Sequence, residues 1–157
     1  MPNCPTTTIS PGSRAERSRV GAVGRSYVVA MEPTRFAIRY STLNRVVLGL
    51  IGMGPARSGI WVGPDSVRVV MGWGFRAELP RGDLRQVDPG DVTVLNSLGG
   101  VHGWDGRWIV SGAADGLVRF DLAPEARAHV MGISVRLASL RVSVEDAPSL
   151  TSVLSPA

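Results

Sequence analysis

The chain lacks lysine altogether: every one of the 17 residues in its Lys and Arg total is arginine. An enzyme that forms a Schiff base, including one that uses pyridoxal phosphate, needs a lysine amine. A Walker A loop needs the same amine to reach its phosphates. The composition therefore excludes these classes of enzyme.

Cysteine and histidine are almost as scarce. Cys4 is the only cysteine in 157 residues, so the chain cannot form an intramolecular disulfide or a cysteine-rich zinc site. The two histidines, His102 and His129, have no histidine or carboxylate at the spacing of a dedicated metal site. We therefore expect no metal, no other cofactor and a reducing compartment.

Long apolar runs are also missing. The most hydrophobic run, Val46–Gly54, is about half of the ~20 residues that span a bilayer. The apolar stretch Tyr27–Met31 is too short for the hydrophobic region of a signal peptide. We expect no transmembrane segment and a cytoplasmic location.

The charge is modestly positive and widely spread. The 17 arginines exceed the 13 acidic residues by four, and no dense basic stripe is interleaved with aromatic residues. Sequence-specific binding to DNA or RNA is therefore not expected.

The pattern of the chain changes near Met31. Residues 1–30 are rich in Pro, Ser, Thr, Gly and Arg and have neither helical nor strand periodicity, which predicts a disordered extension. Because Met31 directly precedes the first patterned segment, we expect translation to begin there. Residues 31–157 are expected to form a single β-rich domain.

From Thr34 onward the dominant period is two, which is typical of strands with one buried face. Arg45–Ile51 does not alternate, and is either a buried strand or a short helix. Three alternating triplets predict strands: Phe36, Ile38 and Tyr40; Val67, Val69 and Met71; and Phe75, Ala77 and Leu79.

Turn residues divide the strands. Gly63–Ser66 contains Pro and Asp and predicts a hairpin turn. Glycines and a proline in Asp88–Trp104 predict a long loop with at most one short element, at Val92–Leu95. The turn Ala114–Gly116 is expected to join strands at 107–111 and 117–122 as a second hairpin.

The C-terminal region predicts a bent strand and a helix. Apolar residues fall on odd positions from Ile133 to Leu137 and on even positions from Leu140 to Val144, so we expect a bulge or bend at Ala138 or Ser139. An acidic cap followed by Pro148 then predicts a short terminal helix with Leu150, Val153 and Leu154 at helical spacing. The expected fold is a single bent antiparallel β-barrel or sandwich with a short C-terminal helix.

A small set of residues is a candidate for function. Among the four tryptophans, Trp73 and Trp104 lie beside glycines, where a large ring either folds inward as a plug or is displayed to a partner. We expect plugs, since tryptophan is buried on average. His102 and Asp105, with a serine such as Ser111, contain the residue types of a hydrolase triad, but no nucleophile elbow is present.

Three segments carry a family resemblance: Met71–Pro80, Gly103–Gly112 and Leu140–Leu150. They resemble a group of small uncharacterised proteins of high-GC Gram-positive bacteria and, more distantly, bacterial pleckstrin-homology-like domains. The resemblance implies a strongly bent antiparallel barrel or sandwich closed by a C-terminal helix. The basic cluster that would indicate lipid recognition is absent, because Ser41–Arg45 offers only one arginine.

We therefore expect a non-enzymatic binding module whose partner is another protein or a second copy of the chain. The candidate binding residues are Trp73, Trp104, His102 and Arg107. The alternative is a small-molecule or lipid-binding barrel with a pocket under the Asp88–Gly103 loop. A third hypothesis is a hydrolase-type enzyme that uses His102 and Asp105.

Overall fold

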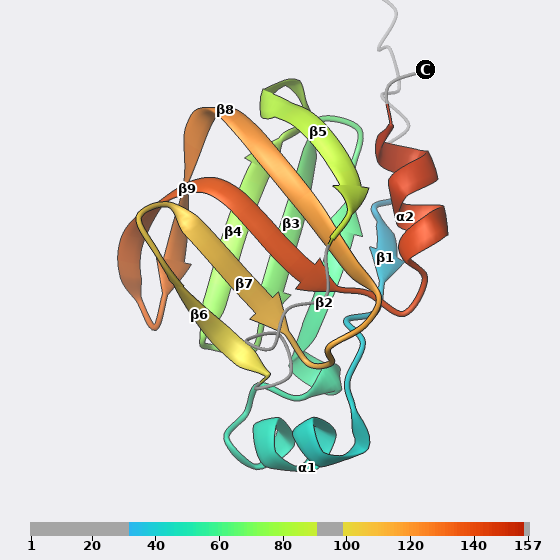
Figure 1. The fold of residues 1–157 in the computed structure, drawn as a ribbon, viewed down its shortest axis with the longest axis vertical. Helices are drawn as coiled ribbons and strands as arrows, with labels where there is room; N and C mark the ends of the chain where they lie inside the picture. Colours follow the sequence, from blue (N-terminus) through green and yellow to red (C-terminus); the bar gives the residue numbers. More distant parts are fainter. Residues whose placement is uncertain (1–31, 91–98, 156–157) are drawn as a thin grey trace, which may run out of the picture. The chain divides into compact units, whose positions relative to one another are not determined.

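The chain folds into a curved β-sheet (Figure 1). Apolar and polar side chains alternate along its strands, and the apolar face of the sheet points inward. The computed structural model describes residues 32–90 and 99–155. The strands are β1 (Thr34–Phe36), β2 (Ser58–Val62), β3 (Ser66–Met71), β4 (Phe75–Pro80), β5 (Leu84–Pro89), β6 (Gly100–Trp104), β7 (Arg107–Ser111), β8 (Leu117–Val130) and β9 (Ile133–Ser143). The helices are α1 (Thr42–Leu50) and α2 (Ala147–Leu154), with short 3-10 helices over Pro55–Arg57 and Arg81–Asp83. The domain is thus mainly β with a short C-terminal helix, as the sequence predicts.

The strands form an open sheet. Among the described residues their order is β1-β2-β3-β4-β8-β9-β7-β6, and β5 pairs with β8 outside this path. β8 pairs with β5 through its first half and with β4 through its second half, and its register on β9 shifts between Asp121 and Ala126. Pro124 lies in that shift and has no N–H to donate to a ladder. Because β1 and β6 remain at the two ends of this order, the sheet does not close into a barrel, which is one of the two architectures that the sequence predicts.

The bend predicted in β9 is confirmed. Leu137 and Leu140 are both fully buried, so the inward face changes from odd to even positions between them. The backbone N–H groups of Ala138 and Ser139 both donate to the carbonyl of Gly106, at 2.7 and 3.0 Å. Two consecutive residues opposite one partner are what defines a β-bulge.

The second predicted hairpin is wrong. β7 and β8 do not pair with each other; β7 pairs antiparallel with β6 and parallel with β9. The hairpin turn is instead Asp105–Gly106, where both residues have positive φ, 52° and 79°, as a type I′ turn requires. Gly100–Trp104, expected to be loop, is therefore strand β6, whereas Val92–Leu95 lies outside the described residues.

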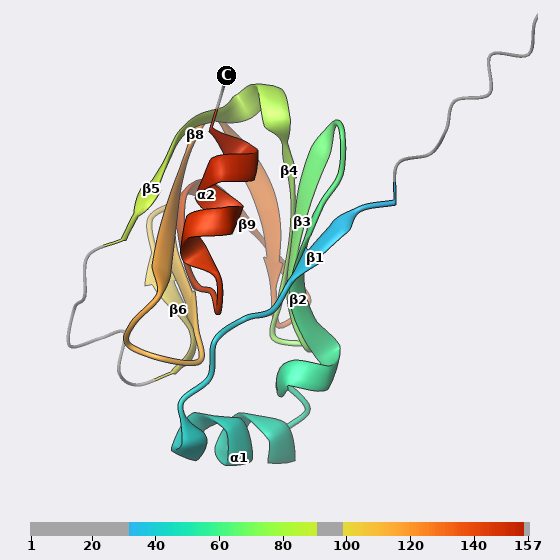
Figure 2. The same ribbon diagram turned by 90° about the vertical axis from the view of Figure 1, so that its right-hand side faces the viewer.

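The apolar core lies inside the curved sheet. Val67, Phe75, Phe120 and Leu140 are fully buried members of one cluster that joins both ends of the sheet. Helix α2 lies between β5 and β8 on one side and β1 on the other, as Figure 2 shows, and it packs against β5 and β8. The described residues contain no helix that is long and apolar enough to cross a membrane.

The terminal helix has the predicted acidic cap. The carboxylate of Asp146 accepts a hydrogen bond from the backbone N–H of Ser149 at 3.1 Å. Hydrogen bonds from Ser149 lower the pKa of Asp146 because they favour the charged carboxylate. Leu150 and Leu154 face the core, whereas Val153 is 43% exposed, so only two of the three expected apolar residues pack inward.

Candidate functional site

Three of the four residues predicted to bind a partner share one outer face. Trp104 and Arg107 are directly paired across β6 and β7, and His102 lies two residues from Trp104 on the same side of β6. Trp73 lies elsewhere, in the turn between β3 and β4. The structure therefore gathers Trp104, His102 and Arg107 and separates them from Trp73.

Neither candidate tryptophan is a plug. Trp73 is 58% exposed and Trp104 is 74% exposed, so the prediction of inward plugs is wrong. The turn that holds Trp73 and the edge strand that holds Trp104 lie at the limits of the sheet, where too few neighbours surround a ring to bury it. Both rings are therefore displayed.

His102 and Asp105 are not joined into a catalytic pair through the imidazole Nε2. That nitrogen is buried and has no hydrogen-bond partner among the described residues. The Asp105 carboxylate lies 3.5 Å from a guanidinium nitrogen of Arg136 and is largely exposed. Within the described ranges, no group of three or more His, Cys, Asp or Glu side chains is placed to hold a metal ion.

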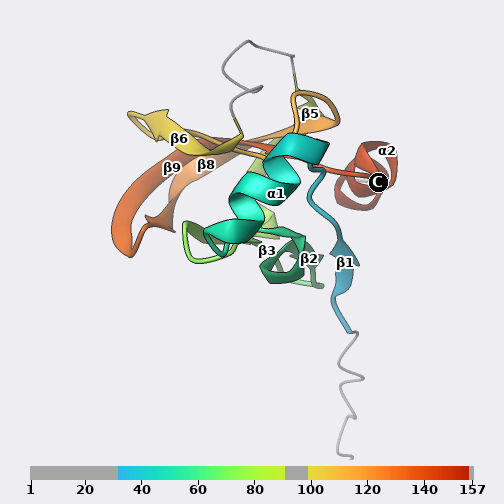
Figure 3. The same cartoon turned by 90° about the horizontal axis from the view of Figure 1, so that it is seen from below.

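Among the described residues, several exposed large apolar side chains gather on helix α1, which lies at the lower end of the domain in Figure 1 and in front of the sheet in Figure 3. Leu43, Val46, Val47 and Leu50 recur at helical spacing, and each is between 49% and 82% exposed. A helix normally turns such a stripe towards its own core. In α1 the only buried residue is Leu48, which lies on a different side of the helix. The apolar stripe of α1 therefore faces solvent.

Two further residues extend this stripe. Ile51 follows the helix and is 49% exposed, and the indole N–H of Trp73 donates to its carbonyl oxygen at 2.6 Å. The hydrogen bond satisfies the indole nitrogen, so the exposed part of the Trp73 ring is apolar. We call this set the α1 apolar surface. It consists of Leu43, Val46, Val47, Leu50, Ile51 and Trp73.

Polar contacts on the opposite side of α1 hold the helix in this orientation. The hydroxyl of Ser41 caps the helix by accepting from the backbone N–H of Asn44. The side-chain amide of Asn44 then donates to the carbonyl of Gly112 at 2.8 Å. At the other end, the backbone N–H of Met53 donates to the carbonyl of Leu48 at 2.8 Å. The amide anchor sets which side of α1 faces the sheet and so leaves the apolar stripe outward.

Tyr40 strengthens this attachment. Its hydroxyl donates to the carbonyl of Met53 at 2.8 Å, which ties the chain before α1 to the chain after it. Burial raises the pKa of Tyr40 above the ordinary value of 10.0, and a hydrogen bond with Ser58 offsets part of this effect.

Because the pKa of Tyr40 is raised, the free energy of unfolding is expected to fall at alkaline pH. The stabilising contribution of protonated Tyr40 is complete below pH 10 and is lost as the pH rises through the folded-state pKa. We expect the phenolate absorbance of Tyr40, obtained by subtracting the titration of a Tyr40→Phe variant, to appear above the ordinary range. If the difference titration were centred at the ordinary pKa of tyrosine, the burial of the Tyr40 hydroxyl would be contradicted.

No family model, curated protein or solved structure matches this chain. Its function therefore has to be inferred from its own surfaces. Helix α1 is the second of the two alternatives predicted for Arg45–Ile51, but of the six residues of the α1 apolar surface only Trp73 was a predicted binding residue. The signal was present as the spacing of Leu43, Val46, Val47 and Leu50, yet the run Arg45–Ile51 suits a strand or a helix equally well until its hydrogen bonds are known.

Proposed function

We propose that this protein is a non-enzymatic module that associates with a second copy of itself through the α1 apolar surface. The observation that carries the proposal is the outward stripe of α1, four large aliphatic side chains on one helix face with no core to cover them. Exposing such an apolar stripe to water is unfavourable in free energy, and contact with another apolar face removes the stripe from solvent.

The size of the surface supports a partner as large as another copy of the chain. Each of the six residues of the α1 apolar surface is between 49% and 82% exposed, so about half or more of each is open to solvent. A standard interface takes about 800 Å² from each partner, whereas the largest apolar patch of a typical monomer is roughly 300–600 Å². Side chains next to the surface would supply the remaining area.

The chemistry of the stripe supports self-pairing. Leu43, Val46 and Leu50 have the alternating three- and four-residue spacing of a helix–helix seam, and the stripe contains no charged residue. Two α1 helices related by a two-fold axis would therefore meet without like charges between them. The same face would serve both copies.

Sedimentation analysis of wild-type protein and charged variants tests the proposal. We expect the wild type to form a dimer, and Leu50→Glu to weaken association about 30-fold or more, the effect of losing a central interface side chain. The matched control is Val153→Glu, which places the same charge at an exposed apolar position on α2 and is expected to leave the dimer intact.

Two results would overturn self-association. One is a wild type that remains monomeric up to roughly 100 µM, a concentration at which a weak specific dimer is populated. The other is a dimer that Leu50→Glu leaves intact. Binding of monomeric wild type to anionic lipid vesicles, lost in Leu50→Glu, would assign the surface to a membrane instead and would also reject the proposal.

We extend the proposal to the fold relationship and the location. A pleckstrin-homology-like origin is supported by the bent strands β8 and β9 and by the packing of α2 beside β5. A cytoplasmic location is supported by the single cysteine, which leaves no intramolecular disulfide for an oxidising compartment to maintain.

A further inference from the structure

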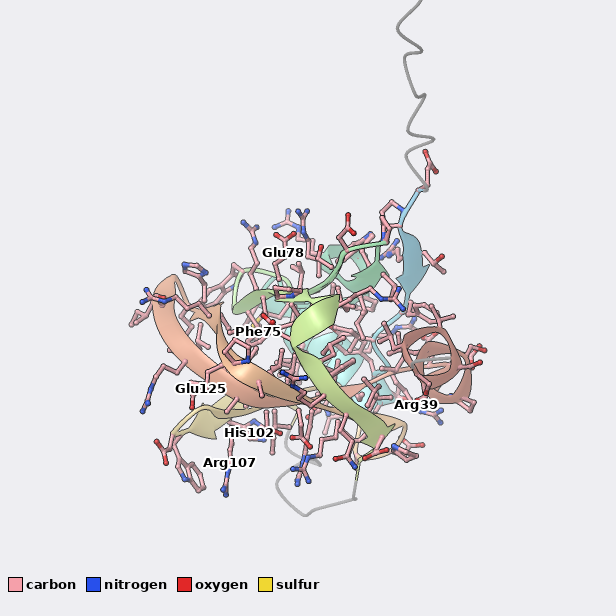
Figure 4. The ribbon with its side chains drawn as sticks, turned by 90° about the horizontal axis from the view of Figure 1, so that it is seen from above. Arg39, Phe75, Glu78, His102, Arg107 and Glu125 are labelled. Atoms are coloured by element: carbon pink, nitrogen blue, oxygen red, sulfur yellow. The ribbon has the colours of Figure 1, made fainter. Side chains whose placement is uncertain are left out.

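A second surface lies on the outer face of β2, β3 and β4, away from the α1 apolar surface. It is a groove of about 760 Å³, within the range of roughly 300–1,000 Å³ that is typical of ligand-binding clefts. Trp61 on β2, Arg68 on β3 and Glu78 on β4 are consecutive cross-strand neighbours along its floor. Figure 4 shows Glu78 on the opposite side of Phe75 from Arg107, so this groove and the Trp104 face point in opposite directions.

Positive charge converges on the groove from three strands. Arg68, Arg76 and Arg127 all line it, and His129, the cross-strand partner of Arg76, lies beside them. Glu78 is the one carboxylate among the described residues that line the groove. It is already shared, since it lies 3.9 Å from Arg68 and accepts from the hydroxyl of Ser66 at 3.1 Å.

The remaining arginines are available to a ligand. Within the part of the chain that the structure describes, neither Arg76 nor Arg127 forms an ion pair. Each guanidinium presents a planar fork of donors that matches the oxygens of a phosphate or a carboxylate. The groove therefore suits a ligand with several anionic groups.

Trp61 adds an aromatic platform to this charge. Its ring lies beside Gly59, where an added Cβ would be 3.1 Å from the ring. The guanidinium of Arg35 lies 5.5 Å from the ring centroid and also donates to the carbonyl of Ser58 at 3.2 Å. The guanidinium of Arg35 and the backbone at Gly59 thus hold the half-buried ring in place, and the ring lines the groove.

We propose that this groove binds single-stranded nucleic acid. Arg68, Arg76 and Arg127 contact successive phosphates, and one base stacks on Trp61. A stacking platform beside a row of cations is the arrangement by which proteins hold single strands without sequence preference, because every base has a π-face. An acidic peptide would satisfy the arginines but would leave the ring of Trp61 without a planar partner. The inference does not depend on the proposed self-association.

Fluorescence anisotropy with fluorescein-labelled oligo(dT) and oligo(rU) tests this proposal. We expect saturable binding that weakens with salt, with a slope of log K against log salt of about −2 for three phosphate contacts. Replacing both Arg76 and Arg127 with alanine should lower affinity at least tenfold and bring the slope close to −1. Trp61→Leu should lower affinity about tenfold and leave the slope unchanged, because stacking releases no counterions.

A matched pair of substitutions is available on the opposite face. The double variant Trp104→Leu with Arg107→Ala removes the same two residue types from the paired positions on β6 and β7 and should bind like the wild type. The proposal is overturned if oligonucleotides do not bind at low salt, if the Trp104 and Arg107 variant loses binding instead, or if Trp61→Leu has no effect. Equal binding of poly-glutamate, insensitive to Trp61→Leu, would identify a general anion site and also reject it. Thermal melting of each variant separates loss of binding from loss of folding.

Discussion

Replacement of Phe120 with alanine is expected to lower the free energy of unfolding by about 3–5 kcal/mol, the usual cost of removing a buried phenylalanine ring. Phe120 is fully buried on β8, between Val87 of β5 and Leu140 of β9. β8 is the strand that connects the two ends of the sheet, so a cavity here faces residues from both. Total stability of such a domain is only about 5–15 kcal/mol, which makes this loss a large fraction of it.

Urea unfolding followed by circular dichroism measures the loss. Phe120→Leu is the matched control, because leucine keeps most of the apolar volume and should cost clearly less. If Phe120→Ala lost less than about 1 kcal/mol, the ring would not be closely packed and the assignment of the core would be wrong.

Replacement of Gly112 with alanine is expected to destabilise the protein by roughly 3 kcal/mol, through overpacking and broken hydrogen bonds. An added Cβ would lie 2.5 Å from the carbonyl oxygen of Arg39 and 2.5 Å from the ring of Tyr40. The Gly112 carbonyl also accepts hydrogen bonds from the backbone of Ser41 and the side chain of Asn44. The displaced backbone would release α1, and with it the α1 apolar surface.

Hydrogen exchange of the α1 amides, together with urea unfolding, measures this effect. Gly49→Ala is the control on the same helix, because its added Cβ would meet no atom within 4 Å. Alanine in a helix interior is favoured over glycine by about 0.5–1 kcal/mol, so this variant should be slightly stabilised. Unchanged exchange in Gly112→Ala would show that α1 is not held through Gly112.

Local patterns in the sequence determined the faces of the strands. The alternation of β3 and β4, the bulge at Ala138 and Ser139, and the cap at Asp146 all depend on residues that are close in the chain. Side chains alternate across a strand whatever its partner is, and a capping side chain bonds within its own turn. These features could therefore be predicted without knowledge of the fold.

Pairing of distant strands was decided only by the tertiary structure. The dipeptide Asp-Gly occurs at Asp105–Gly106 and at Asp115–Gly116, yet only the first forms a hairpin turn. After the second, the chain crosses over, because β7 takes β9 as a parallel partner. The two sites have the same local turn chemistry, and the difference lies in contacts with residues that are distant along the chain.

The candidate surfaces also depend on such distant contacts. The spacing of Leu43, Val46 and Leu50 is visible in the sequence. The hydrogen bond from the Asn44 side chain to the Gly112 carbonyl decides that this stripe faces outward. The arginines of the groove are scattered along the chain and come together because β2, β3, β4 and β8 are neighbours in the sheet. The sequence by itself thus determined which side chains share a face of each strand or helix. The tertiary structure alone decided which faces meet and which remain exposed, because burial depends on contacts between residues that are far apart in the chain.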